Sequence, residues 1–296
     1  LRNTFWSSLE VHGDSVALIE GRKSLSYSEL AQKADQWTTA ARRFLPANVD
    51  KPLVSMEMSN SISAVSAYLG CLRAGWPVIV LAEGQTSEAQ SIVDLYQPNL
   101  IVETAGRKVT PRSGSDLPCR FLPDLALLLS TSGTTGARKL VRLSGQNIQA
   151  NAESIADYLA IESADTSITT LPLQYSYGLS VLHSYLQAGA SVVLSDISVV
   201  QPEFWELARS KDVTSLALVP TQFELLAKGG FRKDWLPSLR YITQAGGRLD
   251  PVLATRFAQD SLDNRWQFFI MYGQTEAGPR ISYLPAADAL DYGNSI

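Results

Sequence analysis

Short apolar runs rich in Val, Ile and Leu recur along the chain and alternate with segments of helical period. Runs without polar alternation are typical of strands buried on both faces, and their alternation with helices predicts an α/β protein with parallel sheets. The clearest amphipathic helix covers residues 27–44, and residues 62–74 and 148–159 follow the same pattern. The expected strands are Val16–Ile19, Leu53–Met56, Val78–Leu81, Leu100–Val102, Leu125–Leu129, Ile168–Leu171, Val192–Leu194, Ser215–Val219, Tyr241–Thr243 and Phe268–Met271.

A polar, proline-containing stretch from Glu103 to Pro123 has little periodicity. Stretches of this composition commonly connect folded units. We therefore expect one α/β subdomain over residues 1–110 and a second over residues 111–296. At the start of the helix at 27–44, Ser26 or Ser28 is the candidate cap.

Composition narrows the class of protein. The 296 residues are 45% hydrophobic and 18% charged, which is enough apolar material for a large core. A formal net charge of -4 gives no broad positive field, so we expect no nucleic-acid partner and only local anion binding. No apolar run has the length of a membrane span and no signal-peptide pattern opens the chain, so we expect a cytoplasmic protein. Cys71 and Cys119 lack metal-ligand spacing and are expected to be buried thiols.

Residues 130–139 form a loop of small polar residues that follows an apolar run and ends on a cation. Gly133 and Gly136 let several backbone N–H groups converge on one anion, and the serine and threonine hydroxyls add donors. Lys139 supplies a full positive charge, so the loop is suited to phosphate. The alternative is a solvated hairpin turn, since the same residue types dominate turns. The loop is not a Walker A motif, because Leu140 follows the lysine in place of Ser or Thr.

A second group of polar residues, Tyr272-Gly-Gln-Thr-Glu276, leaves the strand expected at 268–271. In open α/β sheets ligands gather at the carboxyl ends of strands, so this position favours a site. Tyr272 is suited to stack on a planar base, Thr275 to donate to phosphate and Glu276 to hold Mg²⁺. The alternative is a strand-to-loop turn whose tyrosine packs in the core.

Two further strand exits carry weaker signals. Gly246 and Gly247 follow the strand at 241–243 and allow close approach of a flat ligand, although a glycine pair often simply ends a strand. Residues 171–178 contain Tyr175 and Tyr177 before a glycine, and their alternative interpretation is a helix start packed by Tyr177.

Histidine is scarce, with only His12 and His183 in the chain. His183 lies in a stretch of helical period, and no Gly-x-Ser-x-Gly elbow occurs. A hydrolytic triad is therefore not expected. We expect His183 to be a packed or partly exposed helix residue.

Taken together, the loop with Lys139, the segment 171–178, Ala245-Gly246-Gly247 and the pentad 272–276 occur in the order and spacing of the adenylate-forming superfamily. Over nearly its whole length the chain resembles the acyl- and aryl-CoA synthetases, luciferases and nonribosomal peptide synthetase adenylation domains. The resemblance implies two stacked α/β subdomains in αβαβα layers. It also implies that most of a barrel subdomain and a small C-terminal domain with a catalytic lysine follow Ile296, so we expect a fragment that lacks part of its site.

The resemblance implies an AMP-forming acid-thiol ligase. ATP and a carboxylic acid would give an acyl-adenylate and pyrophosphate, and the acyl group would pass to CoA or to the phosphopantetheine of a carrier protein. A carboxylate is already an anionic nucleophile, so this chemistry requires charge neutralisation rather than a general base. The implied partners are a small carboxylate, CoA or an acyl or aryl carrier protein, and the C-terminal domain.

The resemblance also assigns roles by position. It implies that Lys139, Thr275 and Glu276 are catalytic, with Glu276 as the Mg²⁺ ligand. Residues implied to face the acyl group are Tyr175, Ser176, Tyr177, Leu179 and Gly246, which suggest an uncharged group that is aromatic or of medium size. Residues implied to bind ATP are Thr131, Ser132, Gly133, Thr134, Thr135, Gly136, Lys139, Gly246, Gly247, Arg248, Tyr272, Gly273, Gln274 and Thr275.

The chain departs from the family pattern in four places. Arg138 and Leu140 replace the usual Pro and Gly around the loop lysine. Tyr175 stands where many members have a His that positions the substrate carboxylate, and Ser176 stands where amino-acid-activating members have an Asp, which disfavours an α-amino acid. A noncatalytic nucleotide- or acyl-binding module is therefore an alternative hypothesis. A kinase that releases ADP is a third.

Overall fold

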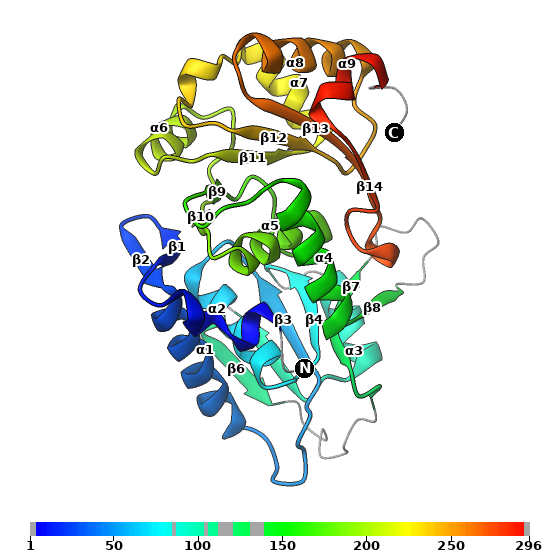
Figure 1. Cartoon of the computed structure of the whole chain (residues 1–296). Helices are drawn as coiled ribbons and strands as arrows, with labels where there is room; N and C mark the ends of the chain where they lie inside the picture. The colour runs from blue at the N-terminus through cyan, green and yellow to red at the C-terminus, as the bar shows by residue number, and fades with distance from the viewer. Residues whose placement is uncertain (1–3, 85–86, 104–105, 112–120, 131–138, 293–296) are drawn as a thin grey trace.

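Strands and helices alternate along residues 4–84, 87–103, 106–111, 121–130 and 139–292, which the computed structural model describes (Figure 1). The α-helices are α1 Tyr27–Arg42, α2 Ile62–Arg73, α3 Ser87–Tyr96, α4 Gly145–Tyr158, α5 Ser176–Gln187, α6 Pro202–Ser210, α7 Pro220–Gly229, α8 Pro251–Asp263 and α9 Ala289–Tyr292. Short 3-10 helices are η1 Phe5–Ser7, η2 Leu9–His12, η3 Lys233–Trp235, η4 Thr275–Ala277 and η5 Ala286–Asp288.

The strands of the described residues form a six-stranded and an eight-stranded sheet. Strand order is β6-β5-β3-β4-β7-β8 in the first and β14-β13-β12-β11-β9-β10-β1-β2 in the second. Their bounds are β1 Val16–Glu20, β2 Lys23–Ser26, β3 Val54–Met58, β4 Val78–Ala82, β5 Leu100–Glu103, β6 Lys108–Pro111, β7 Leu125–Ser130, β8 Leu140–Ser144, β9 Thr166–Ile168, β10 Ser191–Leu194, β11 Ser215–Leu218, β12 Tyr241–Gln244, β13 Gln267–Tyr272 and β14 Ser282–Leu284.

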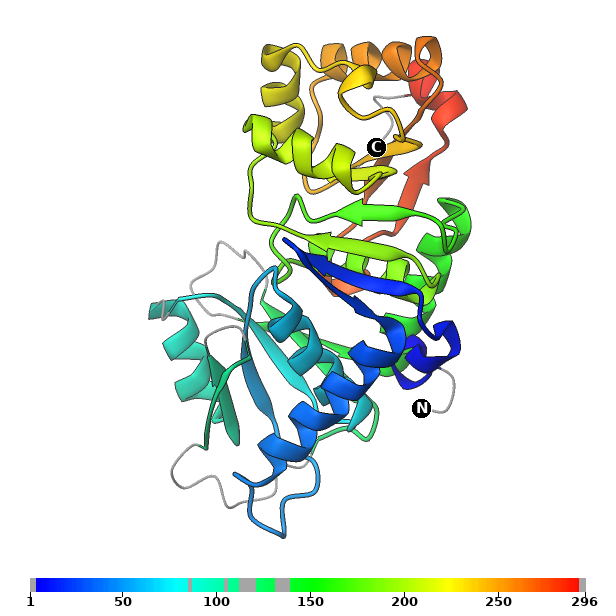
Figure 2. The same ribbon diagram turned by 90° about the vertical axis from the view of Figure 1, so that its left-hand side faces the viewer.

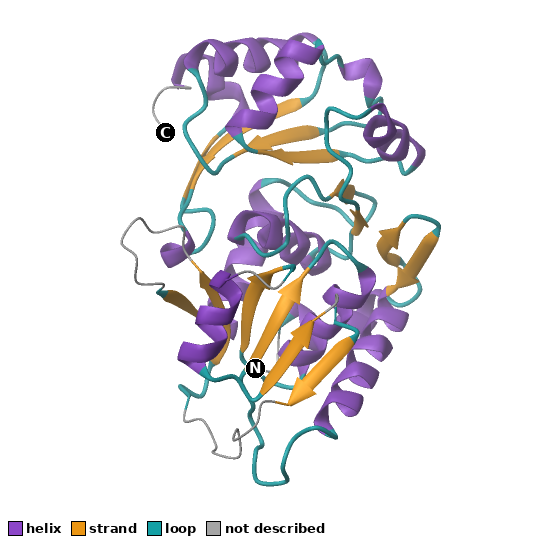
Figure 3. Cartoon of the chain, turned by 180° about the vertical axis from the view of Figure 1, so that it is seen from behind, coloured by secondary structure: helices purple, strands orange, loops and turns teal. Residues whose placement is uncertain are grey.

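The two sheets are stacked with a layer of helices between them, as the front and rear views show (Figures 1 and 3). This middle layer contains α2, α4 and α5, with α1 packed against α2. Helix α3 covers the other face of the six-stranded sheet, and α6, α7 and α8 cover the outer face of the eight-stranded sheet. The predicted αβαβα arrangement is confirmed.

The side chains of alternate residues in one strand pack into different layers of the fold. In β4, Val78 and Val80 pack into the middle layer, whereas Ile79 and Leu81 pack toward α3. In β13, Phe269 faces the middle layer and its neighbours face the outer helices. Because both faces are buried, the strands are continuously apolar, which explains why the sequence pattern located them.

All ten predicted strands are present, although β9 lies slightly earlier than the predicted run 168–171. Four additional strands, β2, β6, β8 and β14, were not predicted. Each is antiparallel to its neighbour and lies at an end of a sheet. Strand β6 lies within the stretch 103–123 that the sequence predicts to be a connection, so that prediction is wrong for Lys108–Pro111. Edge strands are exposed on one side and can be short and polar, so they lack the apolar run that marks an inner strand.

The sheets do not divide the chain at residue 110. Strands β1 and β2 pair with the eight-stranded sheet through β10, and β7 and β8 belong to the six-stranded sheet. Figure 2 shows the N-terminal hairpin in blue beside the green strands of the eight-stranded sheet. Pairing over such a long sequence separation depends on tertiary packing, which the local pattern does not contain.

Three neighbouring parallel strands, β11, β12 and β13, end at the same edge of the eight-stranded sheet. In their common register Leu218 of β11 is opposite Gln244 of β12, and Gln244 is opposite Ile270 of β13. Their carboxyl ends therefore meet at the same edge, where parallel α/β sheets bind ligands.

Candidate active site

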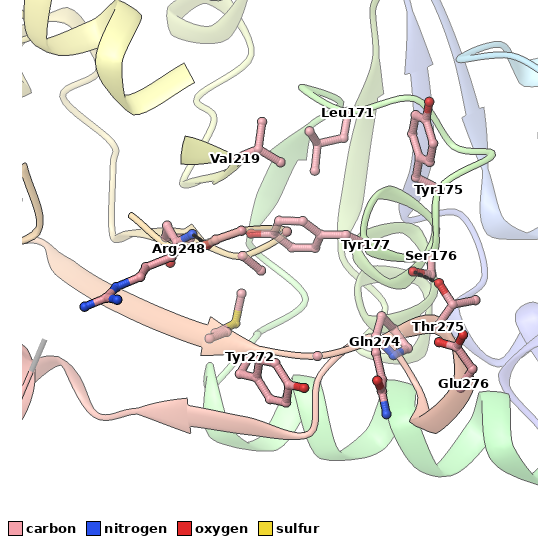
Figure 4. Close-up of a pocket in the computed structure, with 17 residues that line it drawn as sticks. Leu171, Tyr175, Ser176, Tyr177, Val219, Arg248, Tyr272, Gln274, Thr275 and Glu276 are labelled. Carbon is pink, nitrogen blue, oxygen red and sulfur yellow. Dashed lines mark hydrogen bonds between the residues drawn. The ribbon is translucent and has the colours of Figure 1, made fainter. Parts of the chain in front are cut away.

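A cavity of about 920 Å³ opens at the carboxyl ends of β11, β12 and β13 (Figure 4). Its wall combines residues 175–177 at the start of α5, residues 244–248 after β12 and residues 271–276 at the end of β13. The sequence predicts a ligand site at each of these three strand exits separately. The structure brings all three to one cavity.

One wall of the cavity is flat and glycine-rich. Gly246 has φ +81°, a left-handed conformation that side chains rarely adopt, and an added Cβ would lie 3.1 Å from Val219 Cγ1. Gly247 accepts a hydrogen bond of 2.7 Å from Gln244 Nε2, and Arg248 is exposed at the rim. Tyr272 is 51% exposed and lines the same cavity, so the alternative in which it packs in the core is wrong.

The loop after β13 folds back on itself and presents polar side chains to the cavity. A Cβ at Gly273 would lie 1.8 Å from the carbonyl oxygen of Pro279, so only glycine fits this close approach. The backbone N–H of Ile281 donates to the Tyr272 carbonyl at 2.8 Å and closes the loop. The loop thereby places Gln274, Thr275 and Glu276 at the cavity wall.

Hydroxyl groups from two segments meet beside this loop. Ser176 Oγ lies 3.2 Å from Thr275 Oγ1, within hydrogen-bond distance. Glu276, the next residue, is exposed and also lines the cavity. Two hydroxyls and one carboxylate are therefore adjacent to a space large enough for a ligand.

Aromatic residues form the opposite part of the wall. Tyr175 is 60% exposed, whereas Tyr177 is buried and hydrogen-bonds Thr243 Oγ1 at 2.8 Å. Burial raises the pKa of Tyr177, so its phenol stays neutral and fixed. Tyr177 thus packs at the start of α5 and also lines the cavity. The predicted packing role and the predicted ligand-facing role are therefore compatible.

Leu179 does not line this cavity. It is buried beside an adjacent cavity of about 420 Å³, which shares Ser176 and Glu276 with the larger one. His183 lines the smaller cavity and lies 2.9 Å from the Tyr68 hydroxyl through Nε2. Burial lowers the pKa of His183 to about 3, so the ring is neutral and packed, as the sequence predicts for this helix residue.

The described residues include only the two ends of the predicted phosphate loop. Ser130 ends β7, and exposed Lys139 precedes β8 without lining either cavity. Strands β7 and β8, on either side of the loop, pair antiparallel. The residues predicted to bind phosphate that lie outside the described residues are Thr131, Ser132, Gly133, Thr134, Thr135 and Gly136.

Sequence reasoning missed Arg280, which lies between β13 and β14. Its guanidinium carbon is 5.2 Å from the centroid of the Tyr177 ring, and Nη1 donates to the Tyr158 hydroxyl at 3.0 Å. The only sequence signal is an arginine four residues after the pentad, and nothing in the pattern shows which tyrosines it meets.

Other predicted features can be placed in the described part of the chain. Cys71 is a buried free thiol, and Cys119 lies outside the described residues. Within the described ranges no three His, Cys, Asp or Glu side chains gather in a way that could hold a metal ion. Among the helices of those ranges, none combines the length and apolar character needed to cross a bilayer.

An open α/β sheet with a glycine-rich, tyrosine-lined cavity at its carboxyl edge places the protein in the class of α/β folds that bind ligands at the carboxyl ends of their strands. Residues 121–296 match the family model described as AMP-binding enzyme, which is more than half of the chain. The chain belongs to the AMP-binding enzyme family, and the resemblance predicted from its motifs is confirmed.

Relatives and solved structures agree with this family. An acyl-CoA synthetase of Alternaria alternata is 32% identical over 71% of this chain and 39% of its own length. The D-alanine–D-alanyl carrier protein ligase of Bacillus licheniformis is 23% identical over 93% of this chain and 58% of its own. The o-succinylbenzoate CoA synthetase of Bacillus subtilis, solved with its acyl-adenylate intermediate, superimposes with a TM-score of 0.80 at 21% identity over 98% of this chain and 62% of that one. The chain thus spans less than two thirds of the length of each.

Proposed function

We propose that the protein activates a carboxylic acid with ATP and transfers the resulting acyl group to a thiol. The carboxylate oxygen would attack the α-phosphorus, the bond to the β-phosphate would break, and pyrophosphate would leave. A thiol of CoA or of carrier-protein phosphopantetheine would then attack the carbonyl carbon, and AMP would leave with the bonding electrons. The observation that carries this reaction is the convergence of residues 175–177, 246–248 and 272–276 on one cavity. We also propose a cytoplasmic location.

The nucleotide side of the proposal rests on shape. The glycine pair leaves space where side chains would contact Val219 and Pro220, and Tyr272 offers an exposed ring beside it. A flat base stacks favourably on such a ring while its edges meet backbone groups. We assign the adenine to this wall, with Gly246, Gly247 and Tyr272 as its contacts.

The phosphate side rests on donors and charge. Thr275 would donate to the α-phosphate, and Lys139 would neutralise the phosphates from the end of the loop. Glu276 fits a Mg²⁺ site, because Mg²⁺ is commonly held by one or two carboxylates together with substrate phosphates. When bound, Mg²⁺ would supply charge neutralisation at the phosphates. No general base is required, which agrees with His183 being buried and neutral.

The acyl side rests on the remaining wall. Tyr175 and Tyr177 offer aromatic surface, and the Ser176 hydroxyl lies where a substrate carboxylate would approach Thr275. Because Ser176 carries no charge, the wall offers no partner for an α-ammonium group at that position. We therefore propose an acid without an α-amino group.

The test is exchange of labelled pyrophosphate into ATP by the full-length protein with a panel of carboxylic acids. We expect exchange with at least one acid and its near-complete loss in Glu276→Ala. Glu224→Ala is the matched control, because Glu224 is an exposed carboxylate on α7 that lines neither cavity. Exchange that survives Glu276→Ala would contradict the role of Glu276.

Other outcomes separate the alternatives. AMP binding without exchange for any acid would favour the noncatalytic module, and release of ADP would favour the kinase hypothesis.

A further inference from the structure

Arg280 carries a positive charge that the described part of the chain leaves uncompensated. Its Nε is buried without a hydrogen-bond partner, and among such buried atoms of the described residues it is the only one on a charged side chain. The described residues give this guanidinium one side-chain hydrogen bond, to the Tyr158 phenol, and no ion pair. A phenol and a ring face are weak partners for a desolvated cation.

The other half-buried arginines of the described residues are paired with carboxylates. Arg73 contacts Glu10 at 2.6 Å and Asp35 at 2.8 Å, and Arg240 pairs with the buried Asp165. Enclosing a guanidinium is unfavourable unless an anion accompanies it. The contrast indicates that Arg280 is positioned for an anion that the described residues do not supply.

The charge lies behind one wall of the larger cavity, although Arg280 itself does not line that cavity. Tyr177 lines the cavity, and the guanidinium of Arg280 lies over its ring. The Tyr158 hydroxyl connects the same guanidinium to Met271, since it accepts from Arg280 Nη1 and donates to Met271 Sδ at 3.0 Å. Met271 and Pro279, the residue before Arg280, also line the cavity. An anionic group on this side of the cavity would therefore be close to an unshielded positive charge in a medium of low dielectric constant.

We propose that Arg280 makes the cavity select carboxylic acids that carry a second carboxylate. The first carboxylate is the one activated beside Thr275, and the second is held at the wall formed by Tyr177 and Met271. This inference rests on the proposed function and refines it, because the aromatic wall alone suggests an uncharged acyl group. Because Arg280 lies behind this wall and does not line the cavity, its charge would act on the second carboxylate through the intervening protein of low dielectric constant.

The test compares acids that differ only in the second carboxylate: hexanoate with hexanedioate, and benzoate with benzene-1,3-dicarboxylate. KM in pyrophosphate exchange and Kd by calorimetry are measured for the full-length protein. We expect the dicarboxylate of at least one pair to have a KM about tenfold or more lower, since opposite charges a few ångströms apart in a medium of low dielectric constant attract by at least this much. Arg280→Met should abolish the preference and leave KM for ATP unchanged.

Two further variants keep the result interpretable if Arg280→Met folds poorly. Arg280→Lys retains the charge and should keep part of the preference, whereas Arg280→Gln should lose it. Arg22→Met is the matched control, because Arg22 is exposed in the β1–β2 turn and should behave as wild type.

Each outcome decides the inference. Exchange with equal KM for both members of each pair, or a preference that survives Arg280→Met and Arg280→Gln, overturns it while leaving the proposed function in place. A rise in KM for ATP alone in these variants assigns the charge to the nucleotide and also overturns it. Selective dicarboxylate binding that depends on Arg280, without exchange for any acid, supports the anion selectivity and overturns the proposed function. Absence of both exchange and acid binding overturns both.

Discussion

The side-chain oxygens of Ser176 and Thr275 lie 3.2 Å apart, although the two residues are separated by 99 positions in sequence. The contact joins the first turn of α5 to η4. In the proposed reaction one of these segments faces the acyl group and the other faces the α-phosphate. The contact therefore lies where the new bond between substrate and nucleotide would form.

Thr275→Ala should lower kcat for acid-dependent exchange by about 100-fold, because one well-placed transition-state donor contributes about 3 kcal/mol. Ser176→Ala should mainly raise KM for the acid, by less than about tenfold, since it removes a hydroxyl beside the substrate carboxylate and leaves the Thr275 donor in place. Steady-state kinetics of pyrophosphate exchange measures both. Thr275→Ser retains the hydroxyl and should stay near wild type, and an equal loss in Thr275→Ser and Thr275→Ala would show that the hydroxyl is not used.

Tyr272→Ala should weaken AMP binding by about 1–3 kcal/mol, the usual range for stacking of a base on an aromatic ring, which is a rise in Kd of about 5- to 150-fold. Tyr272→Phe keeps the ring and should bind normally. Calorimetry with AMP provides the measurement. Tyr292→Ala removes another exposed tyrosine, at the end of α9, and is the control. Unchanged Kd in Tyr272→Ala would place the base elsewhere.

Gly273→Ala should destabilise the fold or displace the loop, because its Cβ would lie 1.8 Å from the Pro279 carbonyl oxygen. We expect a loss at the upper end of the range of about 1–3 kcal/mol for overpacking, together with loss of exchange. Urea unfolding gives the free energy. Gly229→Ala is the control, since a Cβ there meets nothing within 4 Å and alanine favours the helix. Equal stability of the two variants would contradict the close approach.

His183 should make stability fall in mild acid. Burial lowers its pKa from 6.5 to about 3, so between these values the unfolded chain binds a proton that the folded chain does not. The free energy of unfolding therefore decreases as the pH falls from 6.5 toward 3, by about 2 kcal/mol at pH 5 from this residue. Urea unfolding at pH 7.5 and pH 5 should show that the wild type loses this much more than His183→Gln. The pKa of His12 is also lowered by burial, but His12 is present in both proteins and its contribution cancels. Identical pH dependence of the two proteins would contradict a buried neutral ring.

The sequence located inner strands better than edge strands. Runs such as Val78–Leu81 are buried on both faces and stand out as apolar, whereas Lys23–Ser26 and Lys108–Pro111 are polar and depend on a neighbouring strand. The sequence pattern also did not predict which strands belong to which sheet, because the pairing of β1 with β10 joins residues far apart in the chain. Local periodicity reports burial, and it does not report which strands become neighbours.

The candidate site was predicted in parts rather than as a whole. Strand exits with Gly246, Tyr272 and Ser176 could be recognised because loops at carboxyl ends carry ligand contacts. Leu179 was expected beside them, yet it faces another cavity, because the first turn of α5 presents its successive residues to different sides. Arg280 had no motif to mark it, since its significance depends on two tyrosines from α4 and α5 and on the lack of a counter-ion among the described residues.

The two cavities are separated by a shared partition that includes Ser176 and Glu276. A ligand in one compartment that moves or neutralises either residue changes the walls of the other. Thermodynamic linkage then makes the influence mutual: whatever factor the first ligand applies to the affinity of the second, the second applies to the first. A ligand in the smaller compartment beside His183 that displaced Ser176 or Glu276 would therefore also change the affinity of the larger compartment.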